Sequence, residues 1–358
     1  MIDELKNSNN IERNIIMTKQ IDIIGKYNIE NRRYIGNKNK LLDWINDLIE
    51  LNTQGKVFFD VFAGTGVVTN SVLDKYDSFI INDFLFSNNI IYKAFFDNQH
   101  YDRKKLLLKK KEFNLIEYNL HDDDYFVENY GNKFFSNDDA RIIGEIRTLI
   151  DNDKDLNEKE RNILIASLLY SSDKIANTVG HYDAYRKIKE IPNRFEFDLI
   201  NPIHHDKNIK IYREDANELV RHVSSDIAFI DPPYNSRQYS RFYHVLEGIT
   251  KWNKPPLSGV AMKPPVENMS DYSKVIAPKV FDDLIKNLKT NYIVVTYNNT
   301  YESKSSSSKN KITHEEILSS LNSVGDTKIF EIPFQYFNAG NTNLKNHKEF
   351  VFITEVYK

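Results

Sequence analysis

The sequence predicts an α/β fold in which an open, mainly parallel sheet carries a mainly helical insert. Short apolar runs that read as buried strands, such as Val57–Phe62 and Ile227–Ile230, are followed by sharp turns and then by helical patterns. This alternation stops at about residue 100 and resumes at about residue 205. Tyr292–Asn298 is expected to be a further buried strand, and Thr313–Glu316 is expected to be the capped start of a helix. The last two apolar runs, 328–333 and 349–356, are expected to close the sheet as an antiparallel pair.

The composition limits the class of protein. With 358 residues, 41% of them hydrophobic and 13% aromatic, the chain can form one large or two modest domains with a real core. The absence of cysteine excludes disulfides, thiolate zinc sites and a cysteine nucleophile, and we expect no metal ion. The apolar runs are too short for a membrane span and the N-terminus lacks a signal-peptide pattern, so we expect a cytoplasmic protein. A net charge of −3 means that any binding to nucleic acid must come from local basic clusters.

The first candidate segment follows a polar N-terminal arm, residues 1–30. Arg33–Lys40 is a basic loop with a glycine, and it leads into a helix whose apolar residues begin at Leu41. Taken alone, an ordinary loop before an amphipathic helix is the better explanation of this segment.

Two strands then end in turns suited to a ligand. The strand Lys56–Phe62 ends in Ala63–Gly66, where glycines allow a sharp turn and the following helix start can bind an anionic group. A second strand ends in Ile80–Phe84. There Asp83 could hold ribose hydroxyls or cap the next helix, and Phe84 could flank a ligand ring or belong to the core.

Two further strands end in acidic residues. Ile209–Ala216 closes on Asp215, which could cap the helix that follows. Ile227–Ile230 runs into Asp231–Tyr234, in which two successive prolines cannot donate to a strand ladder. The strand must therefore stop there, and the chain leaves the sheet edge as a stiff corner, which is where open α/β sheets bind ligands.

The corner combines groups that suit one planar substrate. Asp231 offers a carboxylate acceptor, the carbonyl of Pro232 offers a second acceptor, Pro233 keeps the corner stiff, and Tyr234 offers a flat ring. Two acceptors can hold both N–H bonds of an exocyclic amine on an aromatic base. The nitrogen lone pair is then directed toward an electrophile while the base stacks on the tyrosine.

These segments resemble the amino-methyltransferases that act on DNA bases with S-adenosylmethionine, whose fourth motif is Asp/Asn/Ser-Pro-Pro-Tyr/Phe. The Asp form resembles the adenine-N6 enzymes, and the motif order resembles the alpha group of restriction–modification systems. The resemblance implies a Rossmann-like S-adenosylmethionine-dependent methyltransferase sheet, S-adenosyl-L-methionine as cofactor and a flipped adenine in double-stranded DNA as substrate. It also implies a monomer, and a cognate restriction endonuclease that acts on the same site.

The resemblance also implies roles for individual residues. Asp231, Pro232, Pro233 and Tyr234 are expected to be catalytic. The cofactor is expected to contact Tyr34, Gly36, Lys38, Asp60, Phe62, Gly64, Gly66, Asp83, Phe84, Asp215 and Asp231. Lys38 is expected near either the cofactor or the target base. The other possible role of Asp215, besides capping, is one that the resemblance implies, as the acceptor for the adenine amine of the cofactor.

The insert, 101–205, is expected to be the target-recognition domain, with 31–100 and 206–358 forming the catalytic domain. The lysine runs within 103–111 either contact phosphates or form a solvated helix face. Basic, amide and aromatic side chains gather in 173–187 and again after the catalytic corner, where they can bind phosphates, read base edges and fill the space left by an extruded base. The residues expected to bind DNA are Lys38, His181, Tyr182, Tyr185, Arg186, Lys187, Arg237, Gln238, Tyr239 and Arg241.

Three other functions remain open at this point. A cytosine-N4 methyltransferase would use nearly the same corner, although Asp rather than Ser at position 231 argues against it. An RNA or protein-amide methyltransferase would not need an insert of about a hundred residues. A non-catalytic DNA-binding module would leave the glycine turn and Asp231 unexplained.

Overall fold

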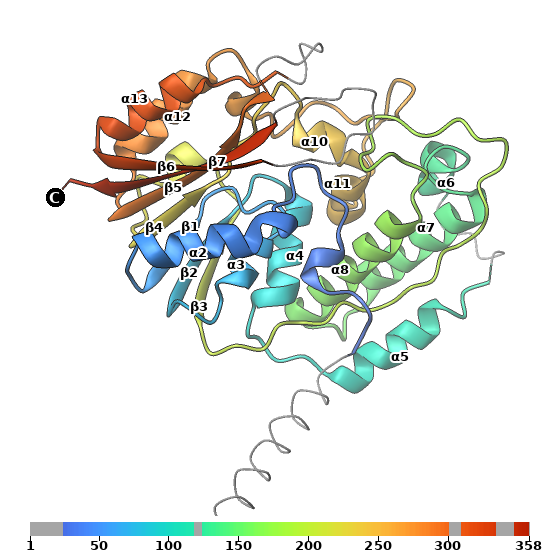
Figure 1. Cartoon of the computed structure of the whole chain (residues 1–358). Helices are drawn as coiled ribbons and strands as arrows, with labels where there is room; N and C mark the ends of the chain where they lie inside the picture. The colour runs from blue at the N-terminus through green and yellow to red at the C-terminus, as the bar shows by residue number, and fades with distance from the viewer. Residues whose placement is uncertain (1–23, 118–123, 301–308, 334–346, 358) are drawn as a thin grey trace, which may run out of the picture.

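The computed structural model describes residues 24–117, 124–300, 309–333 and 347–357. One seven-stranded sheet with the order β3-β2-β1-β4-β5-β7-β6 forms its centre (Figure 1). The strands are β1 (Val57–Asp60), β2 (Ser78–Asn82), β3 (Asn208–Tyr212), β4 (Ile227–Ile230), β5 (Tyr292–Asn298), β6 (Gly325–Pro333) and β7 (Lys348–Val356). All neighbours are parallel except β7, which runs antiparallel to both β5 and β6. The expected α/β class and the antiparallel closing pair are therefore confirmed, and the sheet is Rossmann-like.

Helices cover both faces of this sheet because side chains alternate along each strand. Phe58 of β1 belongs to the core on one face, and its neighbour Phe59 belongs to the core on the other face. The first face is covered by α2 (Leu42–Asn52), α3 (Val67–Ser71) and α4 (Phe86–Phe96). The second face is covered by α9 (Ala216–Leu219), α12 (Ala277–Asn287) and α13 (His314–Asn322).

The expected insert is helical. It contains α5 (Arg103–Phe113), α6 (Tyr125–Tyr130), α7 (Asn137–Asn152) and α8 (Glu158–Ile175). Helix α8 packs against α4 and α7, and its apolar residues join the same core as those of the sheet. Figure 1 shows α7 and α8 beside α4, on the side of the sheet away from β6. Whether this segment acts as a recognition domain stays a prediction.

The remaining elements are short. After β4 the chain forms α10 (Tyr239–Phe242) and α11 (His244–Lys251). The 3-10 helices are η1 (Ile29–Asn31), η2 (Asn39–Leu41) and η3 (Asp271–Ser273). Among the parts of the chain that the structure describes, no helix is long and apolar enough to cross a membrane.

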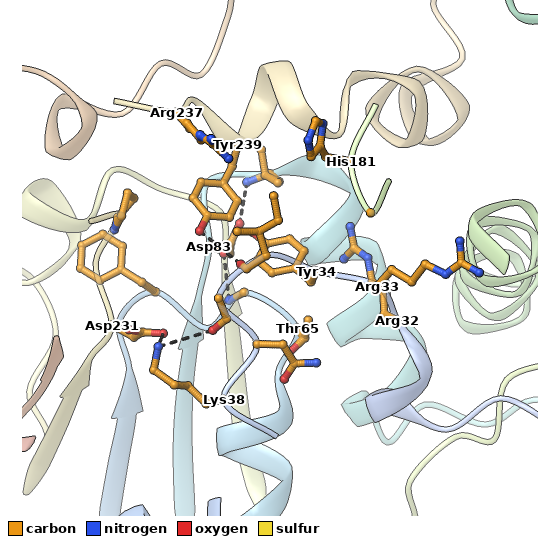
Figure 2. A pocket seen from close by; sticks show the side chains of 18 of the residues that line it. Arg32, Arg33, Tyr34, Lys38, Thr65, Asp83, His181, Asp231, Arg237 and Tyr239 are labelled. Carbon is orange, nitrogen blue, oxygen red and sulfur yellow. Dashed lines mark hydrogen bonds and ion pairs between the residues drawn. The ribbon is translucent and has the colours of Figure 1, made fainter. Parts of the chain in front are cut away.

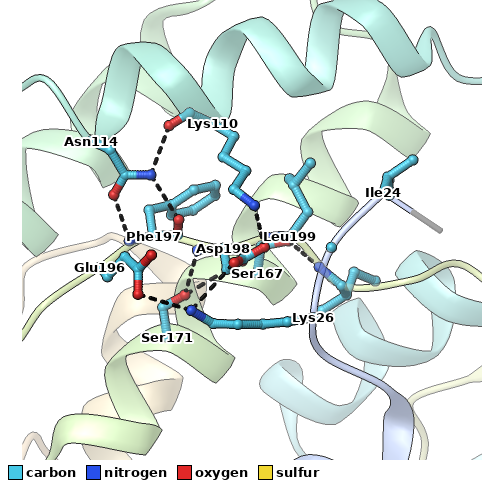
Figure 3. Close-up of polar contacts among 12 residues, drawn as sticks. Ile24, Lys26, Lys110, Asn114, Ser167, Ser171, Glu196, Phe197, Asp198 and Leu199 are labelled. Atoms are coloured by element: carbon cyan, nitrogen blue, oxygen red, sulfur yellow. Dashed lines mark hydrogen bonds and ion pairs between the residues drawn. The ribbon is translucent and has the colours of Figure 1, made fainter.

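A polar network holds the last part of the insert, around Phe197 and Asp198, against the rest of the protein (Figure 3). The Asp198 carboxylate pairs with Lys110 of α5 at 2.7 Å and with Lys26 at 3.3 Å. The Asn114 side chain accepts from the Phe197 N–H at 2.9 Å and donates to its carbonyl at 2.8 Å. These contacts attach α5 and the start of the described chain to the same segment.

Residues 24–30, which the sequence analysis assigned to an N-terminal arm, belong to the folded body. Ile24, Tyr27 and Ile29 are buried in the main core, and Tyr27 forms a parallel bridge with Ile200. The residues 24–30 therefore pack into the folded body, because their apolar side chains fit between the insert and the sheet. Residues 1–23 lie outside the described residues.

The lysines of α5 are used largely within the protein. Lys105 pairs with Glu160 at 2.7 Å and Lys109 pairs with Asp153 at 2.9 Å, in addition to the pair made by Lys110. These pairs join α5 to the neighbouring helices. They favour a structural explanation of this charge run over the phosphate contacts that the sequence also allowed.

Candidate active site

A cavity of about 1250 Å³ lies at the carboxyl ends of β1, β2 and β4. The chain leaves β1 toward β2 on one side while β4 lies on its other side, so this is the switch point at which open α/β sheets bind ligands. Most residues predicted from the sequence meet here. Those that line the cavity are Tyr34, Gly36, Lys38, Asp60, Phe62, Gly64, Asp83, Phe84, His181, Arg186, Asp215, Asp231, Pro232, Pro233, Tyr234, Arg237, Gln238 and Tyr239.

Four predicted DNA contacts lie behind or beside the cavity lining. The ring of Tyr182 is buried, and its hydroxyl donates to the Asp173 carboxylate at 3.0 Å. Tyr185 packs its ring against a phenylalanine of the insert, and Arg241 donates to a backbone carbonyl at 2.6 Å. These contacts favour supporting roles for the three side chains over direct contact with DNA. Lys187 is exposed outside the lining.

Gly66 also lies outside the lining, and its role in this structure is structural. It has φ +78°, a left-handed conformation that L side chains rarely adopt, and it precedes the first residue of α3. A Cβ atom at this position would lie 3.0 Å from Ile29 and 3.2 Å from Tyr92. The glycine therefore allows the turn after β1 to pack tightly against η1 and α4.

Substituting Gly66 with Ala is expected to lower the free energy of unfolding by about 1–3 kcal/mol, because backbone strain and crowding act together. Gly180→Ala is the matched control: it has φ +103°, but a Cβ atom there would meet nothing within 4 Å. Denaturant unfolding of both variants gives the comparison. An equal loss in the two would show that crowding at Gly66 contributes nothing.

The Asp-Pro-Pro-Tyr corner after β4 forms a closed polar network. Asp231 Oδ1 accepts from the hydroxyl of Thr296 at 2.8 Å and also from the hydroxyl of Tyr234. Asp231 Oδ2 pairs with the Lys38 ammonium at 2.9 Å (Figure 2). Lys38 also donates to the Tyr234 hydroxyl at 2.8 Å, and it is only 6% exposed. The loop before η2 thus places the buried ammonium group of Lys38 beside the Asp231 carboxylate.

The glycine turn after β1 is braced by the acid at the end of β2. Asp83 Oδ2 accepts from the N–H of Gly64 at 3.0 Å, and Oδ1 accepts from the N–H of Leu85 at 2.9 Å. Burial raises the pKa of Asp83. Helix α4 has Leu85 rather than Asp83 at its N-cap, so the capping alternative is wrong here. The carboxylate lies instead between the turn and the cavity.

Asp60, the last residue of β1, has one carboxylate oxygen that is hydrogen-bonded and one that is not. Its Oδ2 accepts from the Thr69 hydroxyl at 2.8 Å, while among the described residues Oδ1 has no hydrogen-bond partner. Burial, together with the nearby Asp231 and Asp83 carboxylates, raises the pKa of Asp60 to about 7. An unpaired buried carboxylate oxygen beside a glycine turn suits a ligand that brings an ammonium group.

The structure confirms one of the two roles predicted for Asp215, the capping of the helix that follows it. Its Oδ1 accepts from the N–H groups of Asn217 at 2.9 Å and Glu218 at 3.3 Å, so it caps α9. Asp215 also lines the cavity. Because both cap bonds use one oxygen, capping does not exclude an interaction of the other oxygen with a ligand, which stays a prediction.

Aromatic rings form the wall between the glycine turn after β1 and the insert. Tyr34 stacks on Tyr243 with the ring centroids 4.7 Å apart and on Tyr239 at 5.2 Å. Gly36 allows this approach, since it has φ +81° and its Cβ position lies 3.4 Å from the Tyr239 hydroxyl. On the other side, Phe62 meets the ring of Tyr272 edge-on at 4.9 Å. The site therefore offers flat apolar surfaces beside its acidic groups.

A family model described as D12 class N6 adenine-specific DNA methyltransferase matches residues 34–308. The chain belongs to this family. It is 32% identical to the modification methylase StsI of Streptococcus sanguinis, over 87% of this chain and 50% of that protein. It is 31% identical to the modification methylase LlaI of Lactococcus lactis, over 75% of this chain and 46% of that protein, so it spans about half the length of these relatives. The type II methyltransferase M.NlaIII of Neisseria lactamica is 27% identical over 88% of this chain and 95% of that protein.

The mouth of the cavity is basic. His181 stacks on Phe242 with the ring centroids 4.6 Å apart, and the guanidinium of Arg237 lies 5.6 Å from the centre of the same ring. Arg186 is exposed at the rim. The lining has exposed or half-buried cationic side chains, among them Arg33, Lys174, Arg186, Arg194 and Arg237. We call these five residues the basic rim.

The sequence analysis missed two residues near the Asp-Pro-Pro-Tyr corner: Thr296, which donates to Asp231, and Glu349, which lines the cavity. Both lie on strands, β5 and β7, that the sequence identified only as buried structure. Glu349 had a signal: it shares its position in the strand alternation with the buried Val351 and Ile353, where an acid is unexpected. Thr296 had none, since threonine is common in strands.

Proposed function

We propose that the protein transfers a methyl group from S-adenosyl-L-methionine to N6 of an adenine that is flipped out of double-stranded DNA at a specific sequence. The observation that carries this proposal is the Asp231 corner, which opens into the same cavity as the acid-lined glycine turn. The D12 class model and the modification methylases among the relatives support the choice of adenine N6.

The chain's residues supply position and charge for this reaction. The Asp231 carboxylate and the Pro232 carbonyl hold the two N–H bonds of the target amine, Pro233 stiffens the corner, and Tyr234 supports the base. The bound cofactor supplies a methyl group on a sulfonium, which is already a strong electrophile. As the N–C bond forms and the S–C bond breaks, Asp231 stabilises the positive charge that develops on N6. The positively charged amine then loses one proton to water.

The cofactor is expected to lie along the acidic residues of the cavity. The unpaired oxygen of Asp60 suits the methionine ammonium, Asp83 suits the ribose hydroxyls, and Asp215 suits the adenine amine. Phe62 and Phe84 both line the cavity, and we expect them to flank the adenine ring. The donor and acceptor groups of the cavity therefore fit S-adenosyl-L-methionine.

The test is incubation with methyl-labelled S-adenosylmethionine and unmethylated duplex DNA of mixed sequence, followed by digestion to nucleosides and chromatography. Label in 6-methyladenine is the expected result. Label in 4-methylcytosine would overturn the base assignment, and label in RNA of the same sequence but not in DNA would overturn the substrate. DNA binding without any transfer would favour a non-catalytic module.

The basic rim is expected to hold the phosphates beside the flipped base. Arg186→Ala should weaken binding to DNA about equally for all sequences and reduce the slope of log K against log salt by about one, because one phosphate contact is lost. The control is Lys111→Ala, which removes an exposed cation from α5, away from the cavity. Fluorescence anisotropy at several salt concentrations measures both. An unchanged slope for Arg186→Ala would exclude this contact.

We propose further that the protein acts as a monomer in the cytoplasm, beside the host DNA. Its product would protect that DNA from a restriction endonuclease that cuts the same sequence. The modification methylases among its relatives are the support for this biological role.

A further inference from the structure

Glu349 is a buried carboxyl group in the active-site cavity that the chemistry above does not use. It lies on β7 opposite Asn298 of β5 and is 6% exposed. Among the described residues, no donor reaches its Oε2 atom. Buried polar atoms in native proteins are nearly always paired, so an unpaired carboxylate oxygen in a cavity points to a partner that arrives during the reaction.

The charged and titratable groups around Glu349 come from three elements. Lys38 approaches from the loop before η2, Asp231 and Tyr234 follow β4, and His347 precedes Glu349 in its own chain segment. Burial raises the pKa of Glu349 to about 7; Asp231 raises it as well, while the Lys38 charge and a hydrogen bond with Asn298 lower it. The carboxyl therefore changes its charge in the working pH range of most enzymes, and Lys38 is the cation close enough to affect it.

The ion pair between Lys38 and Asp231 conflicts with the reaction. Asp231 Oδ1 already accepts from Thr296 and Tyr234, so a target amine must bind at Oδ2, where Lys38 lies 2.9 Å away. The amine becomes positively charged during transfer, and two cations on one oxygen repel each other strongly in a buried site. Lys38 is 6% exposed, so it cannot simply turn to solvent. It needs a second buried anion.

We propose that Lys38 changes partners when the target base enters, leaving Asp231 for the carboxylate of Glu349. This inference rests on the proposed methyl transfer to an amine held by Asp231. Before the base enters, Glu349 carries a proton; when the ammonium arrives, Glu349 releases that proton to water and forms the new ion pair. Glu349 is a positioning residue, since it acts on the reaction through Lys38. The exchange leaves Asp231 free to stabilise the charge on N6.

The first test compares the pH dependence of methyl transfer in the wild type and in Glu349→Gln. Because Glu349 must be ionised to hold Lys38, kcat/KM of the wild type should rise with pH through about 7. Glu349→Gln should lower kcat about 10- to 100-fold and remove the part of this rise that belongs to Glu349, whereas Glu349→Asp should restore some of that part. Asp60, whose pKa burial also raises to about 7, keeps its own contribution to the profile in every variant. The matched control is Glu331→Gln, an exposed acid on the adjacent strand β6, which should keep the wild-type profile. A wild-type profile in Glu349→Gln would overturn the proposal.

The second test is a double-mutant cycle with Lys38→Met. If Glu349 acts through Lys38, adding Glu349→Gln to Lys38→Met should cause no further loss of kcat. Additive losses would overturn the exchange of partners. If the wild type methylates no DNA at all, the proposed function itself fails; if the wild type methylates DNA but the cycle is additive, only this inference fails.

Stability gives a measurement that does not depend on activity. The folded pKa of Glu349, about 7, lies above its ordinary value of 4.5, so folding is favoured by the protonated form and stability is lost as the pH rises from about 4.5 to about 7. The unfolding temperature of the wild type relative to Glu349→Gln should therefore fall across this range. If the difference in unfolding temperature stays constant with pH, Glu349 is not neutral in the folded protein, and the proposed exchange of partners is overturned.

Discussion

Asp231→Asn is expected to lower kcat for methyl transfer by about 10²–10³-fold while the Kd for S-adenosylmethionine stays within a few-fold of the wild type. Asparagine keeps the shape of the side chain but cannot supply the negative charge that stabilises the developing cation on N6. Its amide nitrogen would also face a donor, either Lys38 or the hydroxyls of Thr296 and Tyr234. Initial rates with labelled cofactor give kcat, and calorimetric titration gives the Kd.

The control for this substitution is Asp326→Asn, an exposed acid on β6 that is expected to leave both quantities unchanged. A variant Asp231→Asn that retained more than a tenth of the wild-type kcat would contradict the proposed role. A loss of cofactor binding equal to the loss of kcat would assign Asp231 to the cofactor rather than to the target base.

Asp83→Asn is expected to raise the Kd for S-adenosylmethionine by about 10- to 100-fold, which corresponds to about 1–3 kcal/mol. Both oxygens of Asp83 accept from backbone N–H groups, of Gly64 and Leu85. An asparagine can accept only one of these bonds, and its NH₂ group would then face the other N–H. The glycine turn would shift, and the acceptor expected to hold the ribose would be lost.

The matched control is Asp77→Asn, because Asp77 is an exposed acid that immediately precedes the other end of the same strand, β2. Binding of S-adenosylmethionine to both variants is measured by calorimetric titration, and their folding by denaturant unfolding. At saturating cofactor, kcat of Asp83→Asn should stay close to the wild-type value. An unchanged Kd would show that Asp83 supports the fold but not the cofactor.

The sequence by itself determined the sheet and the position of the site. Tyr292–Asn298 forms β5 with the same bounds that the sequence predicted, because a run of buried apolar residues flanked by polar ones has few alternatives. The capping of α13 by Thr313 with Glu316 was predicted by its local pattern. The turns at the Asp-Pro-Pro-Tyr corner and after β1 could likewise be predicted, because the prolines and glycines there restrict or free the local backbone.

Only the tertiary structure decided which side chains meet. The ion pair Lys38–Asp231 joins residues that are distant in the sequence. The resemblance placed Lys38 near the cofactor or the target base, but nothing in the sequence predicted that it pairs with Asp231. Tyr182 was expected to contact DNA but is buried against Asp173, because its place in the core depends on how the insert folds back on the sheet. Glu349 joins the site since β7 inserts between β5 and β6. Secondary structure follows from short-range sequence, whereas the partners of a buried charge depend on long-range topology.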